Sequence, residues 1–301
     1  MAILATPTAG APTFADTENV NDVYGMIEKV GRQVISAAKA RNPMDVFDKG
    51  FLEYGSTIED VVIKAAVSRG YSKAASSAIT PTAPNKVVRY FNDWTSRDYY
   101  TSVYDADVRA VIAGAQNIGD ISAAQVASLT EGETGEDYDD YKALLAKLVA
   151  TDNGFLRESQ IVDAPDTIEN ALLVIRNIVS AMSFKNDTYS GIEGLETRTS
   201  IDDLYILMPY ELYNAIDIRV LANLFNMEKA DLMARIVQID TEDGYVFVTD
   251  RDSLGMVTRD RQFDSQRNIP ARCQDYRLGV TKMWYYNPLH KLAAIPCGDL
   301  I

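Results

Sequence analysis

Residues 201–250 read IDDLYILMPYELYNAIDIRVLANLFNMEKADLMARIVQIDTEDGYVFVTD, an order of apolar runs and polar breaks that decides the fold. The opening apolar run, 204–208, is typical of a buried strand. Pro209 then stands where a helix would start, because the first helical position needs no amide hydrogen. Apolar residues at roughly helical spacing predict a helix after it, and a second, shorter helix is expected over 228–234.

Two further apolar runs, 236–239 and 245–249, close this stretch. Asp243 and Gly244 lie between them, and this pair predicts a hairpin turn because both residues tolerate a positive backbone φ. The predicted order is therefore strand, helix, helix and hairpin. It contains no cluster of catalytic groups and is typical of a packed scaffold.

Several residues of this stretch form a pattern that resembles the core of tailed-phage major capsid proteins with the Hong Kong 97-type fold. The matching positions are Pro209, Asp217, 220–222, 225–227, 229–231 and 235–237. The resemblance implies an α+β fold with four parts. These are an N-terminal arm (1–56), an extended hairpin loop (57–100), a peripheral domain with a spine helix (101–165 with 270–301) and an axial domain (166–269).

The composition is that of an ordinary globular chain, with 301 residues of which 47% are hydrophobic and 24% charged. No apolar run is long enough for a membrane span, and the first residues lack the pattern of a secretory signal, so we expect the cytoplasm or a particle assembled there. The net charge of −14 argues against binding nucleic acid through bulk electrostatics. It is compatible with a container whose acidic wall does not adhere to DNA.

The residue types that carry most enzyme chemistry are sparse. Cys273 and Cys297 lack a CxxC neighbour and are expected to be reduced and buried. His290 is the sole histidine; it can build neither a zinc site with these cysteines nor a recognisable triad, and is interpreted as turn structure. Phosphate-loop, dinucleotide, serine-hydrolase and zinc-protease motifs are missing. We predict no catalytic, cofactor or metal site, although catalysis by carboxylates alone stays open.

The first fifteen residues, rich in Ala, Thr and Pro, predict an extended arm. A helix with Val23 and Ile27 in its apolar stripe follows it. Two readings stay open: the helix docks on its own domain, or it lies across a neighbouring subunit.

Segments 58–66 and 87–94 predict two strands joined by a tip, 68–86, that is rich in small residues. Such a hairpin is marginal alone in water, so we expect it to rest on a partner chain. The resemblance places here the loop that overlaps the next subunit. We predict no covalent cross-link there. The candidate subunit-interface residues of arm and hairpin are Val23, Ile27, Tyr71, Lys73, Lys86, Arg89, Tyr90 and Trp94.

Aromatic residues over 90–104 alternate with arginines. They would suit a core or a subunit interface, and stacking on single-stranded nucleic acid is the disfavoured alternative. Six carboxylates crowd 131–140; we read them as a solvated loop rather than a cation site. The resemblance places the spine helix in this region, and the acidic insert is expected to interrupt it. Asp166 and Glu169 predict a capping box for a helix reaching 184, and 277–286 with 289–295 predict a closing hairpin.

The leading hypothesis is therefore a structural protein and not an enzyme. The resemblance implies self-assembly into the pentamers and hexamers of an icosahedral phage head, which encloses double-stranded DNA without reading its sequence. Scaffold, portal or decoration proteins would be further partners, and the virion, assembled in the host cytoplasm, would be the location. An encapsulin-like protein compartment and an oligomeric α+β enzyme are the alternatives.

Overall fold

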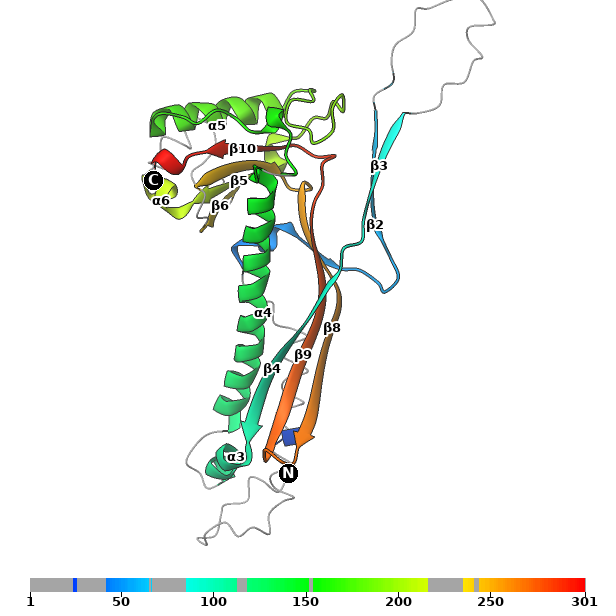
Figure 1. The fold of residues 1–301 in the computed structure, drawn as a ribbon, viewed down its shortest axis with the longest axis vertical. Coiled ribbons are helices and arrows are strands. Elements are labelled where there is room, and N and C mark those ends of the chain that lie inside the picture. The colour runs from blue at the N-terminus through cyan, green and yellow to red at the C-terminus, as the bar shows by residue number, and fades with distance from the viewer. Residues whose placement is uncertain are drawn as a thin grey trace, which may run out of the picture.

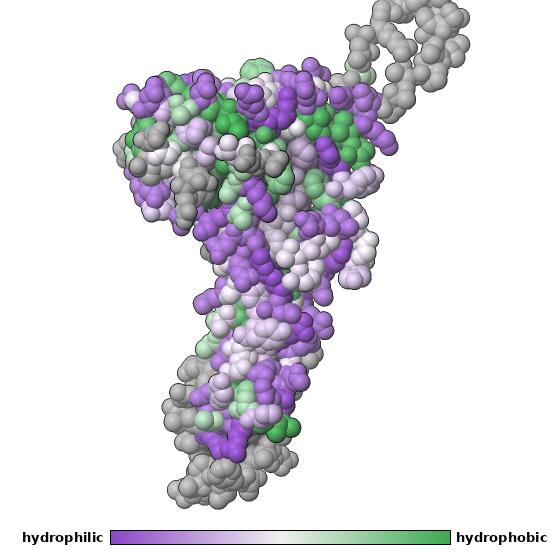
Figure 2. Space-filling model, viewed as in Figure 1, coloured by the Kyte–Doolittle hydropathy of each residue, from purple (hydrophilic) through white to green (hydrophobic). Residues whose placement is uncertain are grey.

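The computed structural model describes residues 24–25, 42–64, 66, 85–112, 118–151, 154–215, 235–240 and 244–300. These residues form a compact upper lobe on a long, narrow stalk, with a two-stranded hairpin projecting from the side (Figure 1). The surface of the stalk is largely hydrophilic, and hydrophobic patches gather on the upper lobe (Figure 2). The fold is α+β, as predicted.

The stalk is a sheet with one long helix beside it. Its strand order is β1-β8-β9-β4, in which β8, β9 and β4 run antiparallel and β1 lies parallel to β8. The helix α4 runs along this sheet, with the short α3 at its foot (Figure 1). The bounds are β1 Asp48–Phe51, β4 Thr95–Tyr104, β8 Leu254–Asn268, β9 Cys273–Tyr286, α3 Asp105–Ile112 and α4 Ile118–Val149.

The upper lobe is a second sheet, of order β10-β7-β5-β6, in which β5 and β6 are parallel. The helix α5 covers one face, and the upper end of α4 with the 3-10 turn η1 covers the other (Figure 1). The bounds are β5 Leu204–Pro209, β6 Ile236–Ile239, β7 Tyr245–Asp250, β10 Leu292–Pro296, α5 Ile168–Met182, α6 Tyr210–Ala215 and η1 Pro43–Phe47, with single turns η2 Glu158–Gln160, η3 Ile201–Asp203 and η4 Gly298–Leu300.

Both faces of this second sheet are buried, and neighbouring residues of each strand serve different cores. Val246 and Val248 of β7 pack under α5, whereas Phe247 between them packs against the α4 side. This is the two-residue period of a strand with no solvent-facing side. It explains why these strands are continuous apolar runs in the sequence.

Two hairpins expected from the sequence are wrong. The apolar runs of β6 and β7 are not neighbours, because β5 lies between them and pairs with both. The closing hairpin fails in the same way: β9 belongs to the stalk, whereas β10 pairs with β7 in the upper lobe. Strands that follow one another in the sequence therefore pair with strands from elsewhere in the chain. A sheet with both faces buried removes more apolar surface from water than a two-stranded hairpin does.

The acidic tract does not interrupt the spine helix. The helix α4 is continuous over 32 residues and includes Gly132 and Gly135. At α5 the predicted start is one residue early, because Thr167 and not Asp166 caps the helix: its hydroxyl accepts from the amide of Asn170 at 3.2 Å. The helix ends at Met182, before the expected 184; Leu172, Ile175, Val179 and Met182, which follow helical spacing, are buried, and Ile168 is partly buried.

The sequence does not predict the long strand β8, which lies between β1 and β9 in the stalk sheet. The expected boundary at 269–270 falls in the turn between β8 and β9, which are paired along most of their length. The strand β10, expected in the same part as β9, lies in the upper-lobe sheet. Both cysteines are buried and free, as predicted. Among the described helices, none combines the length and hydropathy needed to cross a membrane.

Candidate functional site: the projecting hairpin and its base

The hairpin consists of β2 (Ile58–Ile63) and β3 (Lys86–Phe91), which pair antiparallel. It forms a sheet of its own and projects away from the body of the molecule (Figure 1). The predicted strands are thereby confirmed. The predicted tip, 68–86, lies outside the described residues except for its last two positions, 85 and 86.

One face of the hairpin is exposed and largely apolar, with Glu59 at one end and Lys86 at the other. Val61 and Ile63 alternate along β2, and Tyr90 lies on the same face because it pairs with Glu59. These three side chains are 42%, 64% and 65% exposed, respectively. Two strands alone bury too little apolar surface to be stable in water, so this face is the part of the described chain that most needs a covering partner.

The eight predicted interface residues fall into three groups. Lys86, Arg89 and Tyr90 lie on β3 and are exposed, and Trp94 is half-buried beyond the base of the hairpin. The structure does not bring Lys86 and Trp94 together, since Lys86 pairs with Ile63 at the outer end of the strands. The remaining predictions lie outside the described residues: Val23, Ile27, Tyr71 and Lys73.

The chain from the end of β2 into β3 is also basic, although β2 itself carries Glu59 and Asp60. Residues 64–89 contain five lysines or arginines and no aspartate or glutamate, in a chain whose net charge is −14. The rest of the chain therefore carries a larger negative net charge than the total of −14. Such an asymmetry favours contact between this segment and an acidic surface, such as another copy of the same chain presents.

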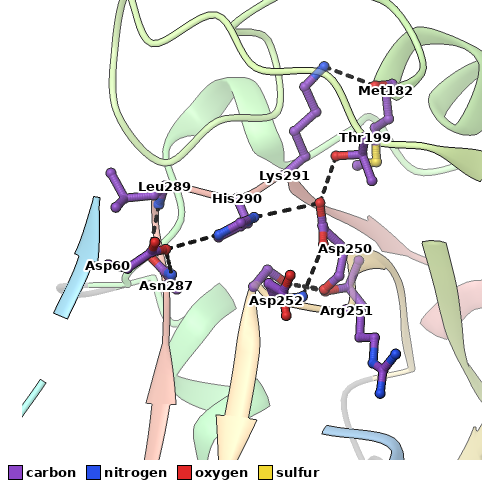
Figure 3. A network of polar contacts seen from close by, with 12 residues as sticks. Asp60, Met182, Thr199, Asp250, Arg251, Asp252, Asn287, Leu289, His290 and Lys291 are labelled. Atoms are coloured by element: carbon purple, nitrogen blue, oxygen red, sulfur yellow. Dashed lines mark hydrogen bonds and ion pairs between the residues drawn. The ribbon is translucent and has the colours of Figure 1, made fainter. Parts of the chain in front are cut away.

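The base of the hairpin is tied to the upper lobe by polar contacts (Figure 3). On β2, the Asp60 carboxylate accepts a hydrogen bond from the side-chain amide of Asn287, and it lies 2.9 Å from Nε2 of His290. Farther out, the Lys64 ammonium donates to the carbonyl of Gly194 at 3.0 Å. The hairpin is thus held at its base by groups from the segment that joins β9 to β10.

The other side of His290 faces Asp250, at the end of β7 (Figure 3). Nδ1 of His290 lies 3.7 Å from Oδ2 of Asp250. This oxygen accepts from the hydroxyl of Thr199 at 2.7 Å, and the other carboxylate oxygen accepts from the amide of Asp252 at 3.0 Å. His290 does lie in a turn, as interpreted from the sequence, but it also links the hairpin to the lobe.

Burial and hydrogen bonding compete in this network. Burial lowers the pKa of His290, but hydrogen bonding and attraction from Asp250, with a contribution from Asp60, outweigh it, so the net pKa lies above its usual value. Burial likewise raises the pKa of Asp250, and hydrogen bonds from His290, Asp252 and Thr199 bring it below the usual range. The arrangement therefore favours a charged carboxylate beside a cationic group.

Lys291, next to this network, is fully buried. Its ammonium donates to the carbonyls of Met182 and Phe184, at 3.1 and 2.8 Å, and to Oδ1 of Asn186 at 3.1 Å. It satisfies carbonyls left open where α5 ends. Burial lowers the pKa of Lys291 to about 8. A lysine inside an apolar run was the signal in the sequence, and it was overlooked.

A stacked arginine supports the base from the other side. The guanidinium carbon of Arg259 lies 3.8 Å from the ring centroid of Trp94 and 5.4 Å from that of Tyr54. Arg259 also donates to the carbonyl of Ser56 at 3.0 Å. This contact fixes the chain on both flanks of the hairpin, and it gives Trp94 a supporting role at the base.

Two of the six carboxylates of the acidic tract belong to an internal ion cluster and not to the solvated loop expected from the sequence. Glu133 lies 2.6 Å from the ammonium of Lys282 and 2.7 Å from the guanidinium of Arg261, and Asp137 also contacts Lys282. The side chains of Glu133, Asp137 and Lys282 are all at least 90% buried. Burial raises the pKa of Asp137 to about 6, against the opposing effect of Lys282.

Within the described parts of the chain, one group of side chains could share a metal ion: Asp250, Asp252 and His290. Each offers a ligand atom, and the three atoms lie within 4.8 Å of one another. Elsewhere in those parts, ion pairs such as that of Glu133 with Lys282 hold elements together. The described residues form a body of two packed sheets that bears a projecting hairpin with an exposed, largely apolar face.

Comparison with known proteins adds three findings. The family model of the Phi29-like phage major capsid protein matches residues 7–295. The major capsid protein of Bacillus phage GA-1 is 27% identical over 282 residues, which are 90% of this chain and 59% of the relative. That of Streptococcus phage Cp-1 is 20% identical over 237 residues, 74% of this chain and 65% of the relative. The chain thus spans about two thirds or less of the length of these curated relatives.

The fold also has solved counterparts. A chain of the capsid structure of Staphylococcus phage Andhra superposes with a TM-score of 0.70 at 14% sequence identity, covering 86% of this chain and 85% of that one. At this identity the similarity establishes a shared fold and nothing finer.

Proposed function

Since the chain belongs to the family of Phi29-like phage major capsid proteins, we propose that it is the structural subunit of an icosahedral phage head. Copies of the chain would tile as pentamers and hexamers into a shell that encloses double-stranded DNA. The observation that carries the proposal is the hairpin β2–β3, whose exposed apolar face finds no support in the described part of its own chain.

The fold within this proposal is of the Hong Kong 97 type. The hairpin would be the extended loop, and the sheet β1-β8-β9-β4 with α3 and α4 would form the peripheral domain, with α4 as its spine. The sheet β10-β7-β5-β6 with α5 and α6 would form the axial domain. This division follows the two sheets. Compared with the ranges expected from the sequence, it moves β8 from the axial to the peripheral domain and β10 from the peripheral to the axial domain. The arm, expected over residues 1–56, would end before η1 and β1, because these two elements pack with the two sheets.

The mechanism is structural. The hairpin would lie on a neighbouring copy, where Val61, Ile63 and Tyr90 would be removed from water and the basic segment would meet an acidic surface. The interface residues proposed earlier keep this role: Lys86, Arg89, Tyr90 and Trp94 at the hairpin, Tyr71 and Lys73 in its tip, and Val23 and Ile27 on the arm. No covalent bond between subunits is part of the proposal.

The remaining attributes follow from the same function. The relatives are named as capsid proteins, which are structural, and this supports a chain that is not an enzyme. Its acidity suits a wall that encloses DNA without sequence-specific contacts. Assembly would take place in the host cytoplasm, the product would be the virion, and scaffold, portal or decoration proteins would be further partners. The match of the phage major capsid family model over residues 7–295 favours this function over a cargo-storing compartment.

A pair of substitutions on the hairpin tests the proposal. Ile63→Thr with Tyr90→Thr removes exposed apolar area but keeps the preference for strand structure. We expect the purified wild-type chain to form closed particles in electron micrographs and the double variant to stay unassembled with an unchanged circular dichroism spectrum. Leu173→Gln, which changes a 51% exposed residue of α5, is the matched control and should leave the fold unaltered.

Two results would overturn the proposal. One is a wild-type chain that stays a monomer or dimer at high concentration. The other is a hairpin double variant that assembles as efficiently as the wild type, since the exposed face would then contribute nothing to contact between copies.

A further inference from the structure

We propose that Asp250, Asp252 and His290 form a binding site for a divalent transition-metal ion of the Zn²⁺ class at the junction of hairpin and upper lobe. Imidazole nitrogen and carboxylate oxygen are ligands that Zn²⁺ accepts, and three protein ligands leave a position for water. The site is distinct from the capsid contacts proposed above, and it stands whether or not the chain forms a shell.

The orientation of His290 is the first argument. Its Nε2 lies 2.9 Å from Oδ2 of Asp60, a hydrogen-bond distance, so Nε2 can keep its proton on Asp60 while an ion is bound. Nδ1 faces Asp250 (Figure 3), and it would release its proton to solvent when it binds the ion. Histidines that bind metals commonly donate their second N–H to a carboxylate, which fixes the ring and raises its basicity. Asp60 stands in that position.

The spacing of the ligand atoms is the second argument. Nδ1 of His290 and Oδ2 of Asp250 are 3.7 Å apart, a separation that two ligands each about 2.0–2.2 Å from one ion can span. Asp252 completes the set, with all three ligand atoms within 4.8 Å of one another. Asp250 is held in place by Thr199 and by the Asp252 amide, so the carboxylate needs no large movement.

Charge and access also suit a cation. Asp60, Asp250 and Asp252 place three carboxylates around one histidine, and Lys49, whose ammonium lies 2.5 Å from Oδ1 of Asp252, is the nearby cation. Lys49 uses one oxygen of Asp252 and leaves the other for an ion. The Asp252 side chain is 59% exposed, so that an ion with its waters can reach the site from solvent.

An ion here would join two parts of the molecule. Asp250 ends β7 in the upper lobe, and His290 is held by Asp60 on β2 of the hairpin. Binding the metal would fix His290 between them, and the base of the hairpin would become more rigid. The ion would therefore act on the attachment of the hairpin, whatever surface the hairpin contacts.

The test uses Zn²⁺ and Co²⁺ alone on the full chain, first treated with a chelator and then cleared of it. Calorimetry should show one Zn²⁺ per chain, and Co²⁺ should give visible absorption of a nitrogen–oxygen site without the near-ultraviolet band of thiolate ligands. Hydrogen exchange of the β2 amides should slow on addition of Zn²⁺. His290→Gln should abolish these effects. Asp60→Asn should raise the dissociation constant for Zn²⁺ about 10- to 100-fold, because losing the hydrogen-bond partner of a metal ligand typically lowers metal affinity by that factor.

Asp139→Asn, at an exposed carboxylate of α4, is the matched control and should bind as the wild type does. A chain that shows no saturable binding of either ion at micromolar concentration would overturn the proposal. So would binding that survives His290→Gln unchanged, because the ion would then be held elsewhere. These readouts do not depend on particles, so a failed metal site and a failed capsid assignment would be told apart.

Discussion

The ammonium nitrogen of Lys282 on β9 lies 2.6 Å from Oε1 of Glu133 on α4, and both side chains are more than nine-tenths buried. Asp137, one helical turn farther along α4, contacts the same ammonium, and Arg261 of β8 pairs with Glu133. The cluster has two positive and two negative members and so is neutral overall. It holds α4 against the stalk sheet at one point along the helix, where a shift of either element would separate the charges.

Replacing Lys282 by Met should therefore destabilise the subunit strongly. The change leaves Asp137 without its cation and Glu133 with Arg261 alone, and breaking a buried pair in this way costs about 3–5 kcal/mol. Urea unfolding of unassembled subunits, followed by circular dichroism, measures the difference. Asp139→Asn, on the solvent side of the same helix, should change stability by less than about 0.5 kcal/mol. Equal effects of the two variants would contradict the cluster's role.

Asp137 should give the stability of the chain a specific pH dependence. Its pKa in the folded protein is about 6, above the value of about 3.9 in an unfolded chain, because burial disfavours the charged carboxylate. Stability from this group is fully present below pH 4 and is lost as the pH rises through 6. In Asp137→Asn this loss is absent, so the stability of the wild type relative to the variant should fall between pH 4 and 6, by on the order of 1–2 kcal/mol. A constant difference would show an unshifted group.

Two glycines should respond in opposite ways to alanine. A Cβ at Gly255 would lie 2.5 Å from the ring of Tyr285, which itself packs 4.6 Å from Phe91 of the hairpin. We expect Gly255→Ala to displace that ring and to cost about 1–3 kcal/mol. Gly135 in α4 has nothing within 4 Å of its added Cβ, so Gly135→Ala should stabilise by about 0.5–1 kcal/mol. Thermal unfolding of both variants measures the two changes in stability. A change of the same sign in both variants would contradict the prediction.

Arg259→Lys should loosen the base of the hairpin. A lysine keeps the charge but cannot stack its planar group on Trp94 or reach the Ser56 carbonyl in the same geometry, a loss of about 1 kcal/mol. Hydrogen exchange of the β2 and β3 amides should accelerate. Arg277→Lys, whose partner Asp98 lies on the stalk, is the control, and it should leave exchange in the hairpin unchanged.

The elements that the sequence predicts well are those whose burial pattern is local. The buried strand β5 is a continuous apolar run, and α5 has Leu172, Ile175 and Val179 at helical spacing. Each element can therefore be recognised from a few neighbouring residues. The hairpin is equally visible, because two apolar segments flank a tip of small residues. The interface residues on it stay predictions, since their role depends on a second chain.

The elements that the sequence hides depend on distant partners. Beyond Arg259, the strand β8 exposes Asp260, Gln262, Asp264 and Gln266 on alternate positions, so it resembles a polar loop until β9 is known to lie beside it. Which strands pair in a sheet likewise cannot be predicted from neighbouring residues, and for this reason both expected hairpins are wrong.

The ion cluster shows the same limit for side chains. Glu133 and Asp137 look like part of a solvated acidic run, because their partners Arg261 and Lys282 stand 128 and 145 positions away. At His290 the sequence shows a single histidine in a turn, and the two aspartates that flank it come from 230 and 40 positions earlier. Only the fold brings these charges together.

The position of the hairpin in an assembled particle tests the central claim most directly. A cryo-electron microscopy map of particles formed by the purified chain, at side-chain resolution, would show what covers Val61, Ile63 and Tyr90. The account predicts that a neighbouring copy covers this face, with the basic segment 64–89 against acidic residues of that copy. A map in which the hairpin folds back on its own subunit, with no contact to a neighbour, would contradict it.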